Sequence, residues 1–473
     1  MANEVLIVPK LSQPRLLNKP QDQKVKLLLS IQPADELRKA ASHIPELAGV
    51  DVCLVIDVST SMKEIIAGET KPTGQTFQAD GKVWAVVDGG TTKIDAALAA
   101  TKQLIPMLRD EDTISLITYE SSPHIIFTGR HKNEQNAILK DIENSQNCYG
   151  ATNISAAIRK AREMLSKFPK ERPKKIIFLT DGQPTDDTEN DGIREGEAVA
   201  KDGLVIDCLG FGNDFNLAFM EKVVTPSKGR SDHIKSPQDA KRVFSLLFKK
   251  AQDIVATNLV LKLAFSPQVR VTEHYRGAPE NLYLGKVQLP DSAREYTLPL
   301  GVLERNQRYD YYFLLTVPPQ GEYTGDFRIL KAVVTYEIPS LQKSGECSKN
   351  VAVEFVSDSK TAEMRDSNVE TGYALAEIKR LERECEDARN RHDKKTVVER
   401  YTEIIERYGR LGMGTEQKAF QQALEEYKKT GNVSLDILNQ ATRSSSKAAD
   451  SGELSKTLGE RDMQNIFGAK KKR

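Results

Sequence analysis

Between residues 51 and 256, short apolar runs alternate with amphipathic stretches, and this alternation restricts the folds open to the chain more than any other feature. Apolar strands that are separated by helices pair in parallel, and a parallel sheet needs helices over both of its faces. We therefore predict an α/β domain over residues 50–256. The predicted strands are 51–58, 113–120, 174–182 and 204–212, and the predicted helices are 133–144, 153–168, 193–203 and 237–256.

Beyond residue 256 the hydrophobic pattern changes to the two-residue alternation of strands. Stretches such as NLVLKLAFS and DYYFLLTV, separated by turns with Gly, Pro and Asp, predict an antiparallel β-sandwich over residues 257–357. The stretch KVKLLLSIQ at 24–32 also reads as a strand and has no partner in the α/β domain. We therefore expect the N-terminal segment, residues 1–49, to add this strand to the sandwich, so that the α/β domain is inserted into the sandwich.

The last part of the chain is helical in its pattern. Residues 358–443 carry apolar residues three and four positions apart, and the charged loop RHDKK separates two such stretches, which predicts a small helical bundle. Residues 444–473 are expected to form a flexible tail, because TRSSSKAADSGE has the composition of a disordered segment. A short apolar stripe precedes the basic end of this tail and consists of Leu454, Leu458, Met463, Ile466 and Phe467.

Composition argues against several classes of protein. The 68 basic and 67 acidic side chains give a net charge of +1, so no overall field would attract nucleic acid, and KKKR at 470–473 reads as a solvated end. No apolar run approaches the roughly 20 residues of a membrane helix, and the N-terminus lacks the pattern of a signal peptide. Five scattered cysteines without a CxxC motif fit a reducing compartment. We expect a cytoplasmic protein without a membrane span.

Three ends of predicted elements carry small side chains with oxygen atoms. The first apolar run ends in Asp57, which is followed by Ser59 and Ser61; the sequence GATN places Thr152 before a helix; and LTDG ends a strand with Asp181. Taken singly, each cluster is more often a turn or a helix cap. Ligands of open α/β sheets gather at the carboxyl ends of the strands, so we expect all five side chains to meet at one rim of the sheet.

As an ordered set, these residues resemble the metal-ion-dependent adhesion site (MIDAS) of the von Willebrand factor type A (VWA) family. The family pattern DxSxS corresponds to Asp57, Ser59 and Ser61, its threonine to Thr152 and its second aspartate to Asp181. The resemblance covers about residues 50–256 and is strongest to soluble multi-domain proteins of bacterial type. It implies a Rossmann-like fold in which the three hydroxyls bind a metal ion directly, while the two aspartates act mostly through water.

Oxygen ligands of this kind suit a hard cation. Mg²⁺ prefers about six oxygen ligands and gives up its waters reluctantly. Neutral hydroxyls leave most of its charge uncompensated, and nearby carboxylates orient the bound waters. An Asp or Glu of a partner protein would then fill an open coordination position. We therefore predict Mg²⁺ as the cofactor, with Mn²⁺ or Ca²⁺ as alternatives, because oxygen ligands exclude only soft metals.

Residues 66–90 depart from the family pattern as an insertion between the first cluster and the helix that follows it. The dipeptide Asp80-Gly81, between TFQ and KVWAVV, predicts the turn of a β-hairpin. This hairpin carries Trp84, the only tryptophan of the chain. Two interpretations remain open: a lid or docking face beside the metal, or a loop that only packs its tryptophan.

The acidic stretch DDTENDG at 186–192 imitates the first half of an EF-hand loop through Asp187, Glu189 and Asp191. The twelfth position of such a loop would be Ala198, where an EF-hand has Glu. A solvated acidic loop is therefore the better interpretation, with a Ca²⁺ site as the alternative.

These observations predict a non-catalytic, Mg²⁺-dependent protein-binding scaffold that docks an acidic residue of a partner. The resemblance admits an accessory subunit of an ATPase- or kinase/phosphatase-linked complex, with a AAA+ ATPase as one such partner. A structural assembly protein with a non-functional metal site is a further alternative. A hydrolase is disfavoured, because the chain has no GxxxxGK[ST], HExxH or GxSxG motif and no histidine at a known spacing from a nucleophile.

Overall fold

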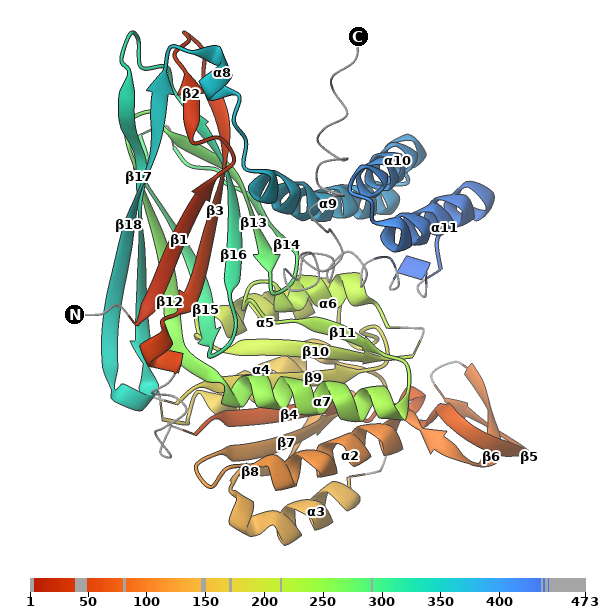
Figure 1. Ribbon diagram of the computed structural model, residues 1–473. Coiled ribbons are helices and arrows are strands. Elements are labelled where there is room, and N and C mark those ends of the chain that lie inside the picture. Colours follow the sequence, from red (N-terminus) through yellow and green to blue (C-terminus); the bar gives the residue numbers. More distant parts are fainter. Residues whose placement is uncertain are drawn as a thin grey trace.

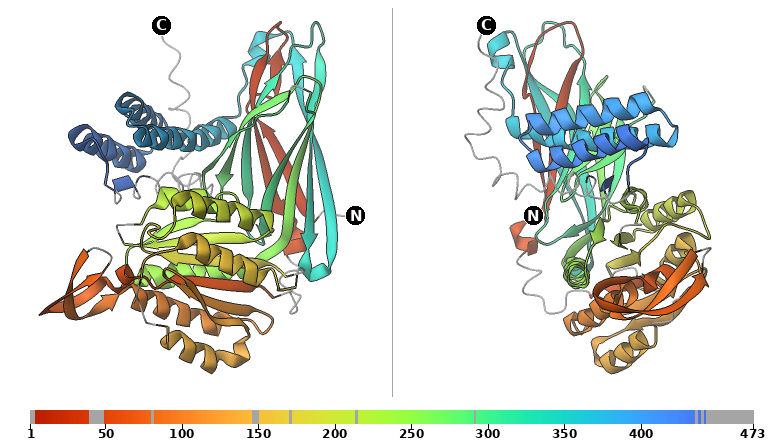
Figure 2. Two further views of the ribbon diagram at one scale, coloured as in Figure 1. Left: turned by 180° about the vertical axis from the view of Figure 1, so that it is seen from behind. Right: turned by 90° about the vertical axis from the view of Figure 1, so that its right-hand side faces the viewer.

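The computed structural model describes residues 4–38, 49–79, 82–145, 150–169, 172–212, 215–290, 292–434, 437–438 and 441. An α/β domain forms one end of the molecule, a β-sandwich stands on one side of it, and a layer of C-terminal helices contacts both (Figures 1 and 2). The predicted flexible tail at 444–473, with its apolar stripe, lies outside the described residues.

The α/β domain is built on a six-stranded sheet with the order β11-β10-β9-β4-β7-β8. The first five strands in this order run parallel, and the edge strand β8 pairs antiparallel with β7. Every residue of the central strand β4 is buried, as expected for a strand with helices over both faces. The strands are β4 (Asp51–Asp57), β7 (Thr113–Tyr119), β8 (Pro123–Arg130), β9 (Lys174–Thr180), β10 (Val205–Phe211) and β11 (Ser231–Ile234).

Helices cover both faces of this sheet. One apolar core lies between the sheet and α2, α3 and α7, and a second lies between the sheet and α4, α5 and α6. The helices are α2 (Lys93–Leu104), α3 (Gln135–Glu143), α4 (Ile154–Leu165), α5 (Glu189–Lys201), α6 (Leu217–Val224) and α7 (Pro237–Gln252). The predicted helix 237–256 was too long, because α7 ends at Gln252 and the β-branched residues that follow begin a strand of the sandwich.

Two five-stranded sheets form the sandwich, and their order is β1-β3-β16-β13-β14 and β15-β12-β17-β18-β2. The expected N-terminal strand is β3, which pairs with β16, so the α/β domain is inserted between β3 and β12. The purely antiparallel prediction was wrong at one edge, where β2 pairs parallel with β18. The strands are β1 (Val5–Leu11), β2 (Arg15–Leu17), β3 (Gln23–Pro33), β12 (Ile254–Phe265), β13 (Arg270–Ala278), β14 (Leu282–Lys286), β15 (Glu295–Glu304), β16 (Tyr309–Val317), β17 (Gly325–Ile338) and β18 (Lys343–Val356).

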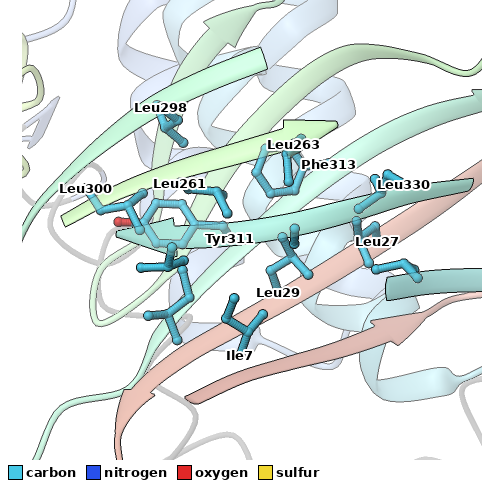
Figure 3. Close-up of a cluster of buried hydrophobic side chains, with 14 of the residues drawn as sticks. Ile7, Leu27, Leu29, Leu261, Leu263, Leu298, Leu300, Tyr311, Phe313 and Leu330 are labelled. Atoms are coloured by element: carbon cyan, nitrogen blue, oxygen red, sulfur yellow. The ribbon is translucent and has the colours of Figure 1, made fainter. Parts of the chain in front are cut away.

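Alternate side chains of both sheets point inward and form the core of the sandwich (Figure 3). The N-terminal strands and the later strands both contribute side chains to this core, so the two chain segments share one core. The labelled members are Ile7, Leu27, Leu29, Leu261, Leu263, Leu298, Leu300, Tyr311, Phe313 and Leu330.

Buried arginines join the sandwich to the α/β domain. The Arg230 guanidinium, from the loop before β11, lies 3.1 Å from both carboxylate oxygens of Glu304 on β15. Arg276 of β13 is fully buried and donates hydrogen bonds to the backbone carbonyls of Lys228, at 2.7 Å, and Gly229, at 3.3 Å. These contacts, together with the two chain crossings, hold the α/β domain in a fixed position.

The C-terminal helices contact both other parts. Val369 and Tyr373 of the first long helix pack on Leu28 and Tyr275, on the outer face of one sandwich sheet. On the α/β side, Lys222 of α6 lies 2.8 Å from Glu386. The helices are α8 (Ser359–Ala362), α9 (Ser367–Asn390), α10 (Lys394–Arg410) and α11 (Gly414–Thr430).

The insertion forms the expected hairpin, from β5 (Ile65–Ala79) and β6 (Lys82–Thr92), and is slightly longer than predicted. The predicted turn Asp80-Gly81 lies outside the described residues. Phe77 and Trp84 stack on each other with ring centroids 6.3 Å apart. Most of the hairpin is exposed, so Trp84 is packed against the hairpin itself and not into a core.

Two further observations bear on the sequence predictions. The cysteines Cys53, Cys208, Cys347 and Cys385 are free and buried. Within the described part of the chain, no helix is long and apolar enough to cross a membrane.

The buried His274 of β13 predicts a pH effect on stability. Its Nδ1 donates to the carbonyl of Gly285 at 3.1 Å, its Nε2 accepts from the Tyr296 hydroxyl at 3.0 Å, and its burial, together with Lys228, lowers its pKa to about 4. The unfolded chain takes up this proton near pH 6.5, so stability is lost as the pH falls from about 6.5 to about 4. Between pH 7 and pH 5, wild type should lose about 2 kcal/mol more unfolding free energy than His274→Phe in urea titrations. Equal losses would contradict this assignment.

Candidate metal centre

The carboxyl end of β4 places Asp57 in the centre of the rim. Its carboxylate is fully buried and accepts three hydrogen bonds: from the Ser59 amide at 2.8 Å, the Thr180 hydroxyl at 2.7 Å and the Tyr119 hydroxyl at 3.3 Å. Thr180 ends β9 and Tyr119 ends β7, which are the two neighbours of β4 in the sheet. Three adjacent strand ends therefore fix one carboxylate in a single orientation.

Ser59 and Ser61 link this carboxylate to the second one, because the Ser59 amide donates to Asp57 and the two serine hydroxyls continue toward Asp181. The two serine oxygens lie 3.1 Å apart, and the Ser61 hydroxyl donates to the Asp181 carboxylate at 2.8 Å. A short 3₁₀ turn, η1 (Thr60–Lys63), places the serines, and its Met62 is fully buried beneath them. The structure therefore brings together Asp57, Ser59, Ser61 and Asp181, as the sequence predicted.

Thr152 lies in the loop beside the serine turn, and its backbone is bonded to Thr185. Its amide donates to the Thr185 hydroxyl at 2.8 Å, its carbonyl accepts from the Thr185 amide at 2.9 Å, and its side chain is buried. The loop before it touches the serine turn, because the Thr60 amide donates to the Gly150 carbonyl at 3.3 Å. Within the described residues, the Thr152 hydroxyl makes no hydrogen bond with the other four predicted side chains.

Gly150 shows why this loop begins with glycine. Its φ of +76° is unfavourable for residues with a side chain. A Cβ atom here would also lie only 2.7 Å from the Glu120 carboxylate. The positive φ therefore favours glycine at this position, and the Glu120 contact is a smaller reason because its flexible side chain could move.

The two aspartates repel each other in a buried environment. Burial, followed by the charge of Asp181, raises the pKa of Asp57 to about 7, against the hydrogen bonds from Ser59 and Thr180. Burial also raises the pKa of Asp181, against the charge of a nearby lysine. A positive ion at the rim would relieve this repulsion.

That lysine, Lys93, is a residue of the rim that the sequence analysis missed. It is the first residue of α2, its side chain is 2% exposed, and its ammonium lies 2.8 Å from the Asp181 carboxylate. It also forms an ion pair with Glu64, which is half exposed. Burial would lower the pKa of Lys93, but Asp181 and Glu64 raise it overall. Lys93 follows the 66–90 insertion, so it is too far from Ser61 in the sequence to be recognised as part of the same cluster.

The hairpin begins and ends at this rim. Figures 1 and 2 show it projecting from the end of the α/β sheet that faces away from the sandwich. Its first strand follows Glu64, its second strand leads into Lys93, and the Lys93 amide donates to the Glu64 carbonyl at 2.9 Å. The hairpin therefore stands beside the predicted metal residues as an exposed arm and does not cover them with a packed core.

The acidic stretch 186–192 has a structural role. The Asp187 carboxylate accepts from the amides of Ile154, at 3.4 Å, and Ser155, at 2.6 Å, at the N-terminus of α4. Thr188 caps α5, which already begins at Glu189. A twelve-residue EF-hand loop is therefore not formed, and the acidic side chains serve helix ends.

The donor set suits a hard divalent cation. Two carboxylates and three hydroxyls offer only oxygen atoms, which are the ligands that hard cations prefer. Among the described residues, neither the rim nor any other region has three or more His, Cys, Asp or Glu side chains placed to hold a metal ion together. Direct ligation at this rim would therefore depend on the hydroxyls of Ser59, Ser61 and Thr152.

Comparison with known proteins identifies this part of the chain. Residues 52–183 match the von Willebrand factor type A domain family. An uncharacterised protein of Synechocystis is 27% identical over 234 residues, which is 49% of each chain. Inter-alpha-trypsin inhibitor heavy chain 4 of mouse is 27% identical over 224 residues, or 41% of this chain and 22% of that protein. The chain thus spans about half the length of the first relative and less of the second.

Solved structures show a similar fold over nearly the whole chain. A von Willebrand factor type A protein from Catenulispora acidiphila has a TM-score of 0.71 at 15% identity and covers 94% of this chain and 97% of its own. The ArnB paralog VWA2 from Sulfolobus acidocaldarius has a TM-score of 0.54 at 18% identity, with 94% and 99% covered. The resemblance to the VWA family is thus confirmed by the family model for residues 52–183, and the likeness in fold to these two structures covers 94% of the chain.

The capping role of Asp187 can be tested by stability. Asp187→Ala removes the acceptor of two amides at the start of α4, so the free energy of unfolding should fall by about 1 kcal/mol. Asp186→Ala, an exposed neighbour in the same loop, should change it by less than about 0.5 kcal/mol. Urea titrations without added metal measure both. Equal effects of the two substitutions would show that Asp187 does not cap α4.

Proposed function

We propose that this protein is a non-catalytic scaffold whose VWA domain binds Mg²⁺ at the rim and docks an acidic residue of a partner protein. Asp57, Ser59, Ser61, Thr152 and Asp181 would form the MIDAS, with the hydroxyls as direct ligands and the aspartates as acceptors for bound water. The observation that carries the proposal is the hydrogen-bonded chain from Asp57 through both serines to Asp181. When bound, the ion would supply a positive charge for an incoming carboxylate.

The residues of the rim would have different roles in binding. Asp57 is fixed by three donors, so it can hold a water in one orientation but is poorly placed to move. Ser61 is partly exposed, whereas Ser59 and Thr152 are buried, so the rim opens to solvent on the Ser61 side. A partner would approach from that side, next to the exposed hairpin.

The same contacts support a binding function over hydrolysis. A metal hydrolase needs a base that can take a proton from an activated water. Asp57 already accepts three hydrogen bonds, and Asp181 accepts from Ser61 and Lys93. Both carboxylates are thus held in place by several donors, which favours a role in positioning water over proton transfer.

The scaffold role rests on how the domain is held. The sandwich and the α/β domain share two chain crossings and the buried Arg230 and Arg276 contacts. The rim lies at the far end of the sheet from the sandwich (Figure 1). The fold would therefore present the rim, and the hairpin beside it, as an exposed and fixed docking face.

The first test is stabilisation by the ion. Mg²⁺ at about one hundred times its dissociation constant should raise the free energy of unfolding by about 2.7 kcal/mol in wild type. The variant Ser59→Ala/Ser61→Ala should show no such increase. Ser166→Ala, an exposed serine far from the rim, should respond like wild type. Equal stabilisation of all three proteins would place the ion elsewhere.

The second test is capture of a partner from native lysate with the same three proteins, each with Mg²⁺ and with EDTA. A docked partner should be captured by wild type and Ser166→Ala in Mg²⁺ only. Substituting its acidic residues one by one should then reveal a single Asp or Glu on which capture depends. An ATPase, kinase or phosphatase as the captured protein would favour an accessory subunit. Capture in every arm would contradict docking through the metal for that partner.

A further inference from the structure

Lys93 places a fixed positive charge inside the rim that the proposed metal would occupy. Its ammonium lies 2.8 Å from Asp181, whose other carboxylate oxygen accepts from the Ser61 hydroxyl at 2.8 Å. Asp181 is thus shared between a lysine and the hydroxyl chain of the candidate site. A metal ion and Lys93 would act on the same carboxylate from two sides.

The local structure is built around this lysine. Gly212, just beyond β10, has a φ of +76°, which favours glycine, and a Cβ atom there would lie 3.0 Å from Lys93 Cε and 3.2 Å from its Nζ, so the glycine also leaves room beside the ammonium. A capping box between Thr92 and Asp95 fixes the start of α2 at Lys93. The backbone and its neighbours therefore direct the side chain into the rim.

The position of Lys93 is unfavourable for the helix alone. Positive side chains in the first turn oppose the helix dipole, and burying a long charged side chain costs solvation. Both costs are offset only by the carboxylates that it meets. Structural neutralisation of Asp181 accounts for the contact, but the contact also changes what the rim can bind.

We infer that Lys93 sets the affinity and charge selectivity of the metal site, acting as a resident counter-ion that weakens metal binding and leaves the bound ion more electropositive toward a partner carboxylate. This inference rests on the proposed function. Lys93 repels any cation at the rim and withdraws part of the charge of Asp181 from it. Lys93 is therefore a positioning and specificity residue and not a metal ligand.

Metal titrations test this inference directly, with isothermal calorimetry of Mn²⁺ and of Tb³⁺ on the full chain. Lys93→Gln keeps a donor for Asp181 but removes the charge, so Mn²⁺ affinity should rise at least about tenfold. The gain for Tb³⁺ should be larger, because repulsion grows with the charge of the ion. Lys93→Arg keeps the charge and should stay within about threefold of wild type. Lys93→Met serves as the second neutral variant if Lys93→Gln does not fold.

Lys175 gives a matched control. It forms an equally buried ion pair with Asp207, 2.7 Å apart, between β9 and β10, away from the hydroxyls of the rim. Lys175→Gln should lower stability as Lys93→Gln does, without changing metal affinity. A purely structural role of Lys93 would leave the affinities of both variants at the wild-type value.

The outcomes separate this inference from the proposal beneath it. If wild type binds Mn²⁺ and Lys93→Gln binds it with the same affinity, the counter-ion role is wrong while the metal site stands. If neither wild type nor the variants bind Mn²⁺ or Tb³⁺, both the metal site and the role of Lys93 are wrong. An equal gain for Mn²⁺ and Tb³⁺ would also contradict an electrostatic role.

Discussion

Two buried carboxylates that repel each other, Asp57 and Asp181, are the constraint on which the rim of the α/β sheet depends. A buried charge is tolerated only where hydrogen bonds or opposite charges compensate it. Asp57 is compensated by an amide and two hydroxyls, and Asp181 by Ser61 and Lys93. The residues around the pair are therefore those that the carboxylates require, whether or not an ion is bound.

The remainder of the fold positions this pair. Parallel pairing of β4 with β7 and β9 brings Asp57, Tyr119 and Thr180 to one level at the carboxyl ends of the strands. The sandwich covers the other end of the sheet through buried arginine contacts, which leaves the rim facing outward. The hairpin between Glu64 and Lys93 adds an exposed arm whose two ends meet at the rim. In this arrangement the contacts with the sandwich lie at one end of the α/β domain, and the candidate site lies at the other end.

The sequence predicted those parts of the fold that have strong hydrophobic periods. Long buried strands such as β4 and amphipathic helices such as α4 were predicted. The edge strand β8 was missed because few of its side chains are buried, and β11 was missed because it has only four residues. The N-terminal segment has three strands where one was predicted. The other two were missed because β2 has only three residues and β1 lies at a sheet edge.

The candidate site divides in the same way. Asp57, Ser59, Ser61, Thr152 and Asp181 stand in short motifs at element ends, so sequence order alone could propose them as one site. The structure joins the first three and Asp181 by hydrogen bonds, while the Thr152 hydroxyl makes none with them in the described part of the chain. Thr180 lies within one of these motifs and could have been included. Lys93 could not, because 31 residues after Ser61, most of them a hairpin, separate it from the first motif, and only the folded chain brings it to Asp181. Charge compensation across an insertion is a property of three-dimensional structure.

The most direct test of the account is the position of a bound ion. Crystals of the protein soaked with Mn²⁺ and measured at the manganese absorption edge would show where the metal lies. We expect one anomalous peak among the hydroxyls of Ser59, Ser61 and Thr152, with Lys93 still beside Asp181. A rim without a peak at saturating Mn²⁺, or a peak at another group of residues, would contradict the central claim.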